Sequence, residues 1–378
     1  MSQHARYVNP RTHETWSDEQ PLWRAPDDGG YVNLTLGNGL TPADIDNSQP
    51  SLWRYRAALR VAPPRLSLGE GWTPLVPGLW GGMSLLWKLD FLMPSGSFKD
   101  RGTAVMLAYL DQVGVTRIIE DSSGNAGASV ATYGGALGMD CRILVPASAP
   151  APKKIQIAAM GVTLEPVEGD RQAVADAALA AADTAFYASH NRQPYFLEGT
   201  KTVAFEIWEQ LGFRVPDAVV APLGQGSNIM GAHIGFAELL AAGQIDRLPR
   251  IYAVQAANAA PYQAAIDAGS DRPVPIQAKP TIADGIAASQ PVRLTEVLDA
   301  LTESGGRCVA VGEDEIAAAL RRFCSMGLFV EPTTAAAGAG LTRFLADGDI
   351  RPGETVAVIL TGSGLKAVEK IGATLGLG

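Results

Sequence analysis

The sequence predicts an α/β protein with two open, mostly parallel sheets that are covered by helices. The first observation is that short apolar runs, typical of strands, alternate along the chain with Ala-rich segments of helical pattern. Such alternation is typical of parallel sheets with helices on their faces. The second observation is size: 378 residues, 47% of them apolar, are enough for about two such domains.

The expected strands are apolar runs bounded by turn residues, at 85–89, 117–121, 141–145, 162–166, 218–221, 250–254 and 356–360. Runs between 117 and 189 should form a compact βαβα block, and the others a second sheet assembled from both ends of the chain. We therefore expect a smaller domain over 109–189 and a larger domain over 63–108 and 190–378. A cleft between two such domains is a preferred position for a ligand.

Residues 1–62 differ from the rest of the chain. Aromatic side chains are interleaved there with Pro, Asp and Gly, as in short strands and loops that aromatic anchors hold against a neighbour. The aromatic residues are Tyr7, Trp16, Trp23, Tyr31, Trp53 and Tyr55. A short helix is expected over 52–59, ended by Pro63 and Pro64. This part is therefore predicted to be an aromatic-rich N-terminal extension.

Charge and composition exclude several classes of partner. The net charge of −9 argues against nucleic acid or an anionic membrane, because both favour a basic face. The chain has no apolar leader at its start and no long apolar run, so a cytoplasmic location is expected. Cys141, Cys308 and Cys324 are few and distant from one another, so we expect neither a disulfide framework nor a metal site.

The stretch 94–102, Pro-Ser-Gly-Ser-Phe-Lys-Asp-Arg-Gly, places Lys99 after a Ser/Gly-rich turn and at the start of an amphipathic helical pattern. The positive end of the helix dipole, together with partial desolvation, should lower the pKa of the Lys99 amine. A neutral amine can attack an aldehyde to form a Schiff base. Taken alone, the stretch is also compatible with a surface lysine in a helix cap.

Three further Gly-rich turns follow strand-like runs. The turn 122–127 should expose backbone amides that bind an anion, such as the carboxylate of a substrate, and the turn 224–228 repeats this arrangement. The third turn, 361–364, places the hydroxyl groups of Thr361 and Ser363 at a strand end. A reactive lysine, two anion sites and a neutral hydroxyl are what pyridoxal phosphate and an amino acid require.

On these motifs the chain resembles the threonine synthases and, more widely, the fold type II pyridoxal-phosphate enzymes. That group includes the serine and threonine ammonia-lyases and the tryptophan synthase β subunit. The resemblance covers 66–366, and its matching segments are 97–102, 123–125, 198–202, 204–207, 224–228, 330–332 and 360–366. It implies that pyridoxal 5'-phosphate lies in the cleft between the two domains, in contact with the larger one.

The resemblance also implies roles for individual residues. Lys99 would hold the cofactor as a Schiff base and shuttle protons, and Asn125 would donate to the phenolic oxygen of the cofactor; a plain helix cap is the alternative for Asn125. The substrate carboxylate would be bound by Ser122, Ser123, Gly124 and Asn125. The cofactor phosphate would be bound by Gly224, Gln225, Gly226, Ser227 and Asn228. Thr361 would face the pyridine nitrogen, with Ser363 as the alternative.

Three further positions belong to matching segments without a settled role. Glu331 is as compatible with a structural role as with a catalytic one. Asp100 and Arg101 are expected to brace the loop around Lys99 through charge-assisted hydrogen bonds rather than to take part in chemistry.

Two departures from the family pattern affect the substrate. Ser363 stands where threonine synthases usually have a histidine, and Phe196 stands where they have an arginine that binds the phosphate of O-phosphohomoserine. An aromatic ring cannot replace a bidentate phosphate ligand. A phosphorylated substrate is therefore in doubt, unless Arg192 takes over the missing role.

We expect a pyridoxal-phosphate-dependent lyase of the threonine synthase type that acts on an α-amino acid by β or γ elimination or replacement. Threonine synthase itself and a diverged homologue with an unphosphorylated substrate both fit this class. A serine- or threonine-type ammonia-lyase is the nearest alternative. A catalytically silent, cofactor-binding regulatory protein is an alternative of another class. The expected assembly is a homodimer.

Overall fold

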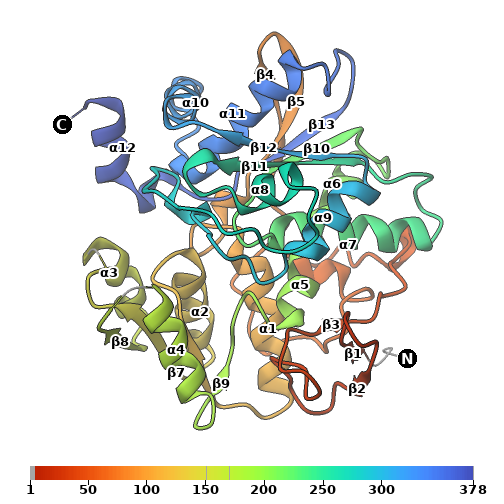
Figure 1. Ribbon diagram of the computed structural model, residues 1–378. Helices are drawn as coiled ribbons and strands as arrows, with labels where there is room; N and C mark the ends of the chain where they lie inside the picture. Colours follow the sequence, from red (N-terminus) through yellow and green to blue (C-terminus); the bar gives the residue numbers. More distant parts are fainter. Residues whose placement is uncertain (1–4, 150, 170, 378) are drawn as a thin grey trace. The chain divides into compact units, whose positions relative to one another are not determined.

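The computed structural model describes residues 5–149, 151–169 and 171–377. The chain divides into two compact units (Figure 1). Unit 1 comprises 1–71 and 99–200, and unit 2 comprises 72–98 and 201–378. The predicted class, an α/β protein with parallel, helix-covered sheets, is confirmed.

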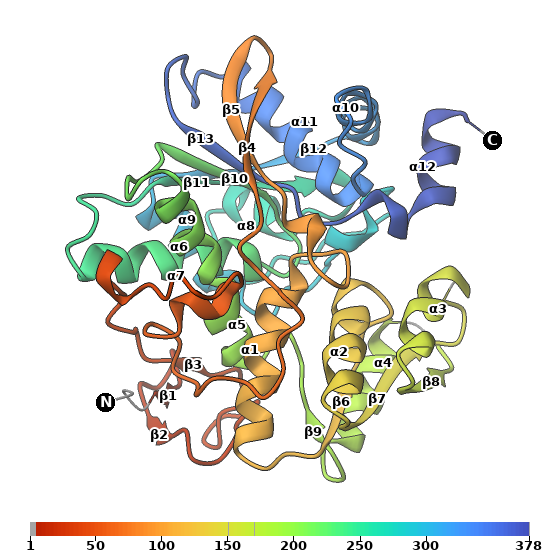
Figure 2. The same cartoon turned by 180° about the vertical axis from the view of Figure 1, so that it is seen from behind.

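Unit 1 contains a four-stranded parallel sheet in the order β8-β7-β6-β9. Its strands are β6 (Arg117–Glu120), β7 (Asp140–Pro146), β8 (Thr163–Val167) and β9 (Phe186–Tyr187). Its helices are α1 (Lys99–Gln112), α2 (Asn125–Ala136), α3 (Ala151–Ala159), α4 (Arg171–Ala181) and α5 (Pro194–Thr200). Side chains of a strand alternate between faces: Ile118 packs in the cluster of α1, α2 and α3, whereas Ile119 packs against α4. Both faces of the sheet are thus covered (Figure 2).

The predicted division placed 63–108 and 190–378 together, whereas by contacts α1 and α5 belong to unit 1. The reason is that α1 packs directly on α5 and on α2. The N-terminal extension joins the same unit through aromatic contacts. Tyr7 and Tyr109 share a hydrogen bond of 2.8 Å between their hydroxyl groups, and Tyr109 stacks on Tyr195 with ring centroids 3.7 Å apart.

The extension itself forms a small antiparallel sheet in the order β2-β1-β3. Its strands are β1 (Arg6–Val8), β2 (Thr15–Ser17) and β3 (Asn33–Leu34). Instead of the helix expected over 52–59, the chain forms a single 3₁₀ turn, η2 (Leu52–Tyr55). All four of its residues are buried, so the segment lacks the exposed face of an amphipathic helix.

Unit 2 contains a six-stranded sheet in the order β12-β11-β10-β13-β5-β4. The strands are β4 (Leu75–Trp80), β5 (Met83–Lys88), β10 (Ala218–Pro222), β11 (Arg250–Ala256), β12 (Arg307–Val311) and β13 (Val356–Ile359). All neighbours are parallel except β4 and β5, which form an antiparallel hairpin at the edge. Because β13 lies between β10 and β5, the sheet is assembled from both ends of the chain, as predicted.

The helices of unit 2 cover both faces of this sheet. They are α6 (Thr202–Gln210), α7 (Ser227–Ala241), α8 (Pro261–Asp267), α9 (Leu294–Glu303), α10 (Glu313–Ser325), α11 (Pro332–Ala346) and α12 (Val368–Leu375). The main core packs Val220 and Val254 of the sheet against α10 and α11, whereas α7 packs with α6 and α9. None of the described helices is long and apolar enough to span a membrane.

A buried ion pair ties β5 to α6 in unit 2. Lys88 Nζ lies 2.6 Å from Glu206 Oε2, and both side chains are 0% exposed. The Glu206 carboxylate also accepts hydrogen bonds from the backbone amides of Trp72 and Thr73, at 2.7 and 3.2 Å. The pair therefore fixes the start of the segment that leads into the hairpin.

We expect Glu206→Ala to lower the free energy of unfolding by roughly 3–5 kcal/mol, because it leaves a buried cation without its carboxylate. Urea denaturation would measure the change. The matched control is Arg343→Ala, which removes the half-exposed pair between Arg343 and Glu315 and should cost about 1 kcal/mol or less. Equal losses for the two variants would contradict this account of the buried pair.

Candidate active site

Lys99 is the first residue of α1, as the sequence predicts. The peptide before it is held within unit 2: Ser97 forms a bridge with Gly362, and the Phe98 amide donates to the Thr361 carbonyl at 2.9 Å. Gly96 has a φ of 85°, a conformation that favours glycine. This turn therefore fixes the point at which the helix begins and at which the lysine side chain leaves the backbone.

The Lys99 amine lies over an aromatic ring. Its Nζ is 5.5 Å from the centroid of the Phe196 ring, and Phe196 is 0% exposed. The ring packs closely against α1 at Gly102, where an added Cβ would lie only 2.6 Å from ring atoms. Burial lowers the pKa of Lys99 to about 8, although the negative charge of Glu120 opposes the shift. A substantial part of the amine is thus neutral, and nucleophilic, at mildly alkaline pH.

The turn of Ser122, Ser123 and Gly124 joins β6 to α2, and Asn125 is the first residue of the helix. The Gly124 amide donates to Ser122 Oγ at 3.2 Å. A side chain at Gly127 would overlap the Ser122 carbonyl, so the loop folds closely over the first turn of the helix. The amides at a helix start have no intrahelical partners and favour an anion. The turn therefore offers backbone amides at a helix start, at the carboxyl end of β6.

Four charged or titratable residues that the sequence analysis did not single out lie beside this turn. His190 Nδ1 is 2.6 Å from Glu120 Oε1, and Arg171 is paired with Asp121 at 2.7 Å. Burial raises the pKa of Glu120 well above its ordinary value and lowers the pKa of His190 well below. In the sequence, Glu120 and Asp121 could have pointed to this cluster. They stand at the end of an apolar strand, where a buried carboxylate requires a partner.

In unit 2, the segment Gly224–Gly226 joins β10 to α7. Gly226 has a φ of 95°, and a side chain there would overlap Val297. Ser227 begins α7, so the backbone amides of Gly226, Ser227 and Asn228 lie at a helix start, where a phosphate binds well. The Gln225 side chain instead accepts a hydrogen bond from the Val292 amide at 3.3 Å. Binding would therefore depend on the backbone here.

Asn228 supports the assignment of this loop to a ligand. Its side chain is 3% exposed, and neither of its polar atoms has a hydrogen-bond partner among the described residues. Buried polar groups are nearly always paired. The Asn228 side chain has its oxygen and its nitrogen both unpaired, and it lies on the first turn of a helix that follows a glycine loop. These features fit a site that a polar ligand completes. The loop thus offers a ligand backbone amides at a helix start and a buried amide side chain.

Thr361 follows β13 and is buried. Its Oγ1 lies 2.9 Å from Thr334 Oγ1, which also accepts a hydrogen bond from the Gly362 amide. This network offers a neutral hydroxyl and no carboxylate. Ser363 instead caps a short 3₁₀ turn by accepting from the Leu365 amide at 3.3 Å. Thr361 therefore remains the better candidate to face a ring nitrogen.

The candidate residues of unit 2 follow the ends of two neighbouring strands, β10 and β13. Because β10 and β13 are parallel neighbours, Gly224 and Thr361 both follow the carboxyl edge of one sheet. In unit 1, Lys99 and Phe196 are in contact, and the Ser122 turn follows the carboxyl end of β6. Asp100 is buried and accepts a hydrogen bond of 2.6 Å from Ser129 of α2; the bracing of the loop around Lys99 stays a prediction.

Glu331 lies at the start of α11. Its amide donates to the Gly362 carbonyl at 2.9 Å, which is a structural role for the backbone. For its side chain, a catalytic role as well as a structural one stays a prediction.

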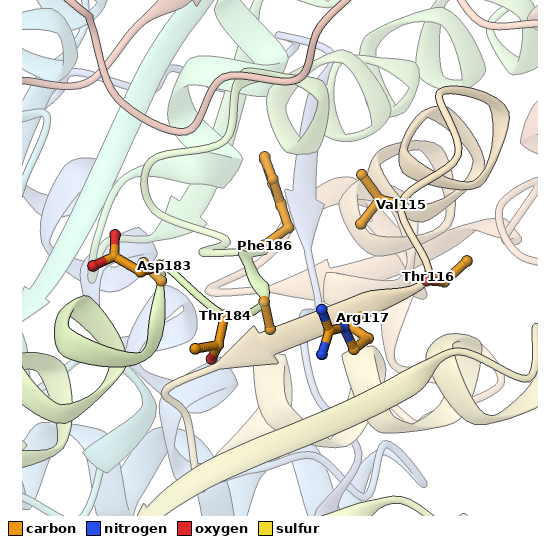
Figure 3. A pocket seen from close by; sticks show the side chains of 8 residues that line it. Val115, Thr116, Arg117, Asp183, Thr184 and Phe186 are labelled. Carbon is orange, nitrogen blue, oxygen red and sulfur yellow. The ribbon is translucent and has the colours of Figure 1, made fainter.

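A shallow hollow in unit 1 lies at the opposite end of the strands. It is lined by Val115, Thr116, Arg117, Ala182, Asp183, Thr184, Ala185 and Phe186 (Figure 3). Arg117 and Phe186 are the first residues of β6 and β9, so the hollow is at the amino edge of the sheet. None of the predicted site residues lines it. Ligands of open α/β sheets bind at the carboxyl edge, where the Ser122 turn lies.

The chain is similar to known proteins over most of its length. Residues 66–362 match the family described as pyridoxal-phosphate dependent enzyme. Curated relatives include the threonine synthase of Methanosarcina acetivorans, 35% identical over 84% of this chain and 80% of that protein. The threonine synthase of Methanocaldococcus jannaschii is 36% identical over 83% of this chain and 80% of that protein.

Solved structures with a similar fold include an L-serine ammonia-lyase from Rhizomucor miehei, with a TM-score of 0.68 and 22% identity over 80% of this chain and 96% of that chain. Another is the serine racemase from Dictyostelium discoideum, with a TM-score of 0.65 and 24% identity over 77% of this chain and 92% of that chain. At these identities the likeness is one of fold.

Proposed function

Because the chain belongs to the family of pyridoxal-phosphate-dependent enzymes, we propose that it is a lyase of the threonine synthase type whose amino-acid substrate carries no phosphate. The observation that carries the proposal is the position of Phe196. Its ring is fully buried, lies under the Lys99 amine and packs on Gly102. The resemblance to the threonine synthases implies a phosphate-binding arginine at position 196, where this chain has an apolar ring.

Pyridoxal phosphate, when bound, withdraws electrons from the α-carbon of an amino acid and so makes its proton removable. The chain supplies the other functions. The Lys99 amine, with its pKa lowered to about 8, would hold the cofactor through its aldehyde carbon and would accept the α-proton of the substrate. The Ser122–Asn125 turn binds the substrate carboxylate. Asn125 would also donate to the phenolic oxygen of the cofactor.

The remaining roles belong to unit 2. The backbone amides of the loop 224–228 and the Asn228 side chain would hold the phosphate of the cofactor. The Thr361 hydroxyl, held by Thr334, would be the group offered to the ring nitrogen. As a neutral group it would not stabilise a proton there as a carboxylate would.

We also propose that the enzyme works as a homodimer in the cytoplasm. The net charge of −9 suits a protein that avoids nucleic acid and anionic lipid. Light scattering on the holoenzyme should give twice the chain mass of 39.6 kDa. A mass equal to one chain at working concentration would exclude the dimer.

A substrate panel tests the proposed function. The holoenzyme is mixed with L-serine, L-threonine, L-homoserine, their O-acetyl derivatives and their O-phospho derivatives, and the release of keto acid, ammonia, acetate and phosphate is measured. We expect turnover of unphosphorylated compounds. Ammonia and keto acid from serine or threonine alone would identify an ammonia-lyase. Efficient formation of threonine and phosphate from O-phosphohomoserine would refute the unphosphorylated substrate, and a cofactor-loaded but inert protein would favour a regulatory role.

The phosphate loop gives a separate prediction. Gly226→Ala adds a Cβ that overlaps Val297 and lies 3.2 Å from the Tyr262 hydroxyl, and it strains a φ of 95°. We expect the dissociation constant of pyridoxal phosphate, measured by titration of the apoenzyme, to rise about tenfold or more, equivalent to roughly 1.4 kcal/mol.

Gly243→Ala is the matched control. Gly243 also has a positive φ, of 68°, and follows the other end of α7, but an added Cβ there meets nothing within 4 Å. This variant should lose some stability and keep its affinity for the cofactor. Equal loss of affinity in both variants would show that helix strain, and not the loop, is responsible.

A further inference from the structure

The pair of Glu120 and His190 has no part in the roles described so far. Glu120 ends β6, and His190 lies in the loop between β9 and α5. His190 Nδ1 lies 2.6 Å from Glu120 Oε1, and the His190 backbone amide donates to Oε2 at 3.4 Å. Glu120 is 0% exposed and His190 is 8% exposed. The carboxylate thus fixes one face of the imidazole and leaves Nε2 as the ring nitrogen for another partner.

This pair is close to the reactive lysine. The His190 ring meets the Phe196 ring edge-on, with centroids 5.9 Å apart, and the Lys99 amine lies 5.5 Å from the same Phe196 centroid. Lys99 and Glu120 also influence each other's pKa through their charges. His190 and Lys99 therefore both border the Phe196 ring, at the position where the family resemblance implies a phosphate-binding arginine.

The surroundings favour a pair that retains one proton. The charged or titratable groups around it are Lys99 of α1, Asp121 after β6, Cys141 of β7, Arg171 of α4 and Tyr187 of β9. Asp121 is neutralised by Arg171 at 2.7 Å. Burial raises the pKa of Glu120 and lowers that of His190, so the overall neutral pair, with one transferable proton, is favoured over the anion.

An unphosphorylated substrate requires such a proton. A phosphate or a carboxylate departs as a stable anion, whereas a hydroxyl group departs readily only as water, after accepting a proton from a general acid. Lys99 cannot provide this proton while it is accepting the α-proton. A second proton-carrying group near the leaving oxygen would divide the two transfers, so that Lys99 accepts the α-proton while the second group protonates the oxygen.

We propose that His190, oriented by Glu120, donates a proton to the leaving oxygen of a hydroxy amino acid. This inference rests on the proposed function. As the carbon–oxygen bond breaks, its electron pair stays on oxygen, the oxygen takes the proton from His190 Nε2, and water leaves. The α-proton accepted by Lys99 then returns to the Glu120–His190 pair. Protons balance over the cycle without any further reactant, and Glu120 is a positioning residue.

The test compares leaving groups. His190→Asn and Glu120→Gln holoenzymes are assayed with L-serine against β-chloro-L-alanine, and with L-homoserine against O-acetyl-L-homoserine. Chloride and acetate leave without a proton, so we expect kcat to fall by about 100-fold or more for the hydroxyl substrates and by less than about tenfold for the others. His233→Asn, which removes the pair of His233 and Glu303 in unit 2, should leave both ratios unchanged.

A second measurement does not depend on turnover. Proton NMR of imidazole-labelled holoenzyme and apoenzyme should show a downfield N–H signal that is lost in His190→Asn, shifted in Glu120→Gln and retained in His233→Asn. Absence of this signal in the wild type would overturn the pair itself.

The outcomes separate the two proposals. One outcome is that the wild type turns over hydroxyl substrates while His190→Asn lowers kcat equally for both kinds of leaving group, or for neither. In that case the inference fails and the proposed function stands. If the wild type acts only on O-phospho compounds, the proposed function fails, and the inference fails with it because no hydroxyl group leaves.

Discussion

Lys99→Ala should abolish turnover, with kcat lowered by on the order of 10⁴-fold or more, because one substitution removes both the nucleophile that holds the cofactor and the base that takes the α-proton. The wild-type protein should be yellow and should be bleached by borohydride, with the cofactor fixed to the peptide that contains Lys99. Mass spectrometry of the digested protein would locate the modification.

The rate at which the apoenzyme captures pyridoxal phosphate should increase with pH. Since burial lowers the pKa of this amine to about 8, the neutral form increases as pH rises through that value. Capture of pyridoxal phosphate by the apoenzyme should therefore accelerate with a midpoint near pH 8, and not near the ordinary lysine value of about 10.4.

Lys279→Ala is the matched control, because Lys279 is an exposed lysine of unit 2. This variant should retain colour, capture rate and activity. A Lys99→Ala protein that still turned over substrate, or a modification fixed on another lysine, would contradict the assignment of Lys99.

Phe196→Arg should shift substrate preference toward O-phosphohomoserine by about tenfold or more. A charge-assisted hydrogen bond contributes roughly 1.5–3 kcal/mol, and about 1.4 kcal/mol corresponds to a factor of ten. The measured quantity is the ratio of kcat/KM for O-phosphohomoserine and O-acetyl-L-homoserine. Because Phe196 is fully buried against Gly102, the variant should also lose stability, and the ratio separates specificity from this loss.

The control for this experiment is Phe196→Leu, which keeps an apolar side chain and adds no charge. It should change both kcat/KM values in parallel. If the wild type already prefers the phosphorylated substrate and Phe196→Arg adds nothing, the apolar ring does not determine specificity, and Arg192 or another cation would be the residue to test next.

Much of the fold was predictable from local patterns. The runs at 218–221 and 356–360 became β10 and β13, and Lys99 opens α1 as the Ser/Gly turn before it predicts. These features depend on residues that are neighbours in the chain, through hydrophobic periodicity and turn glycines. The strand β4 was not predicted, since Pro77 and Gly78 interrupt its apolar run; an edge strand tolerates them.

The sequence by itself determined the α/β class, the start of α1 at Lys99 and the glycine turns at strand ends, because periodicity and backbone conformation are local properties. Only the tertiary structure decided that His190 binds Glu120, 70 residues away, and that Phe196 packs on Gly102. Such contacts depend on which strands and helices become neighbours, and that follows from burial summed over the whole unit rather than from any short segment.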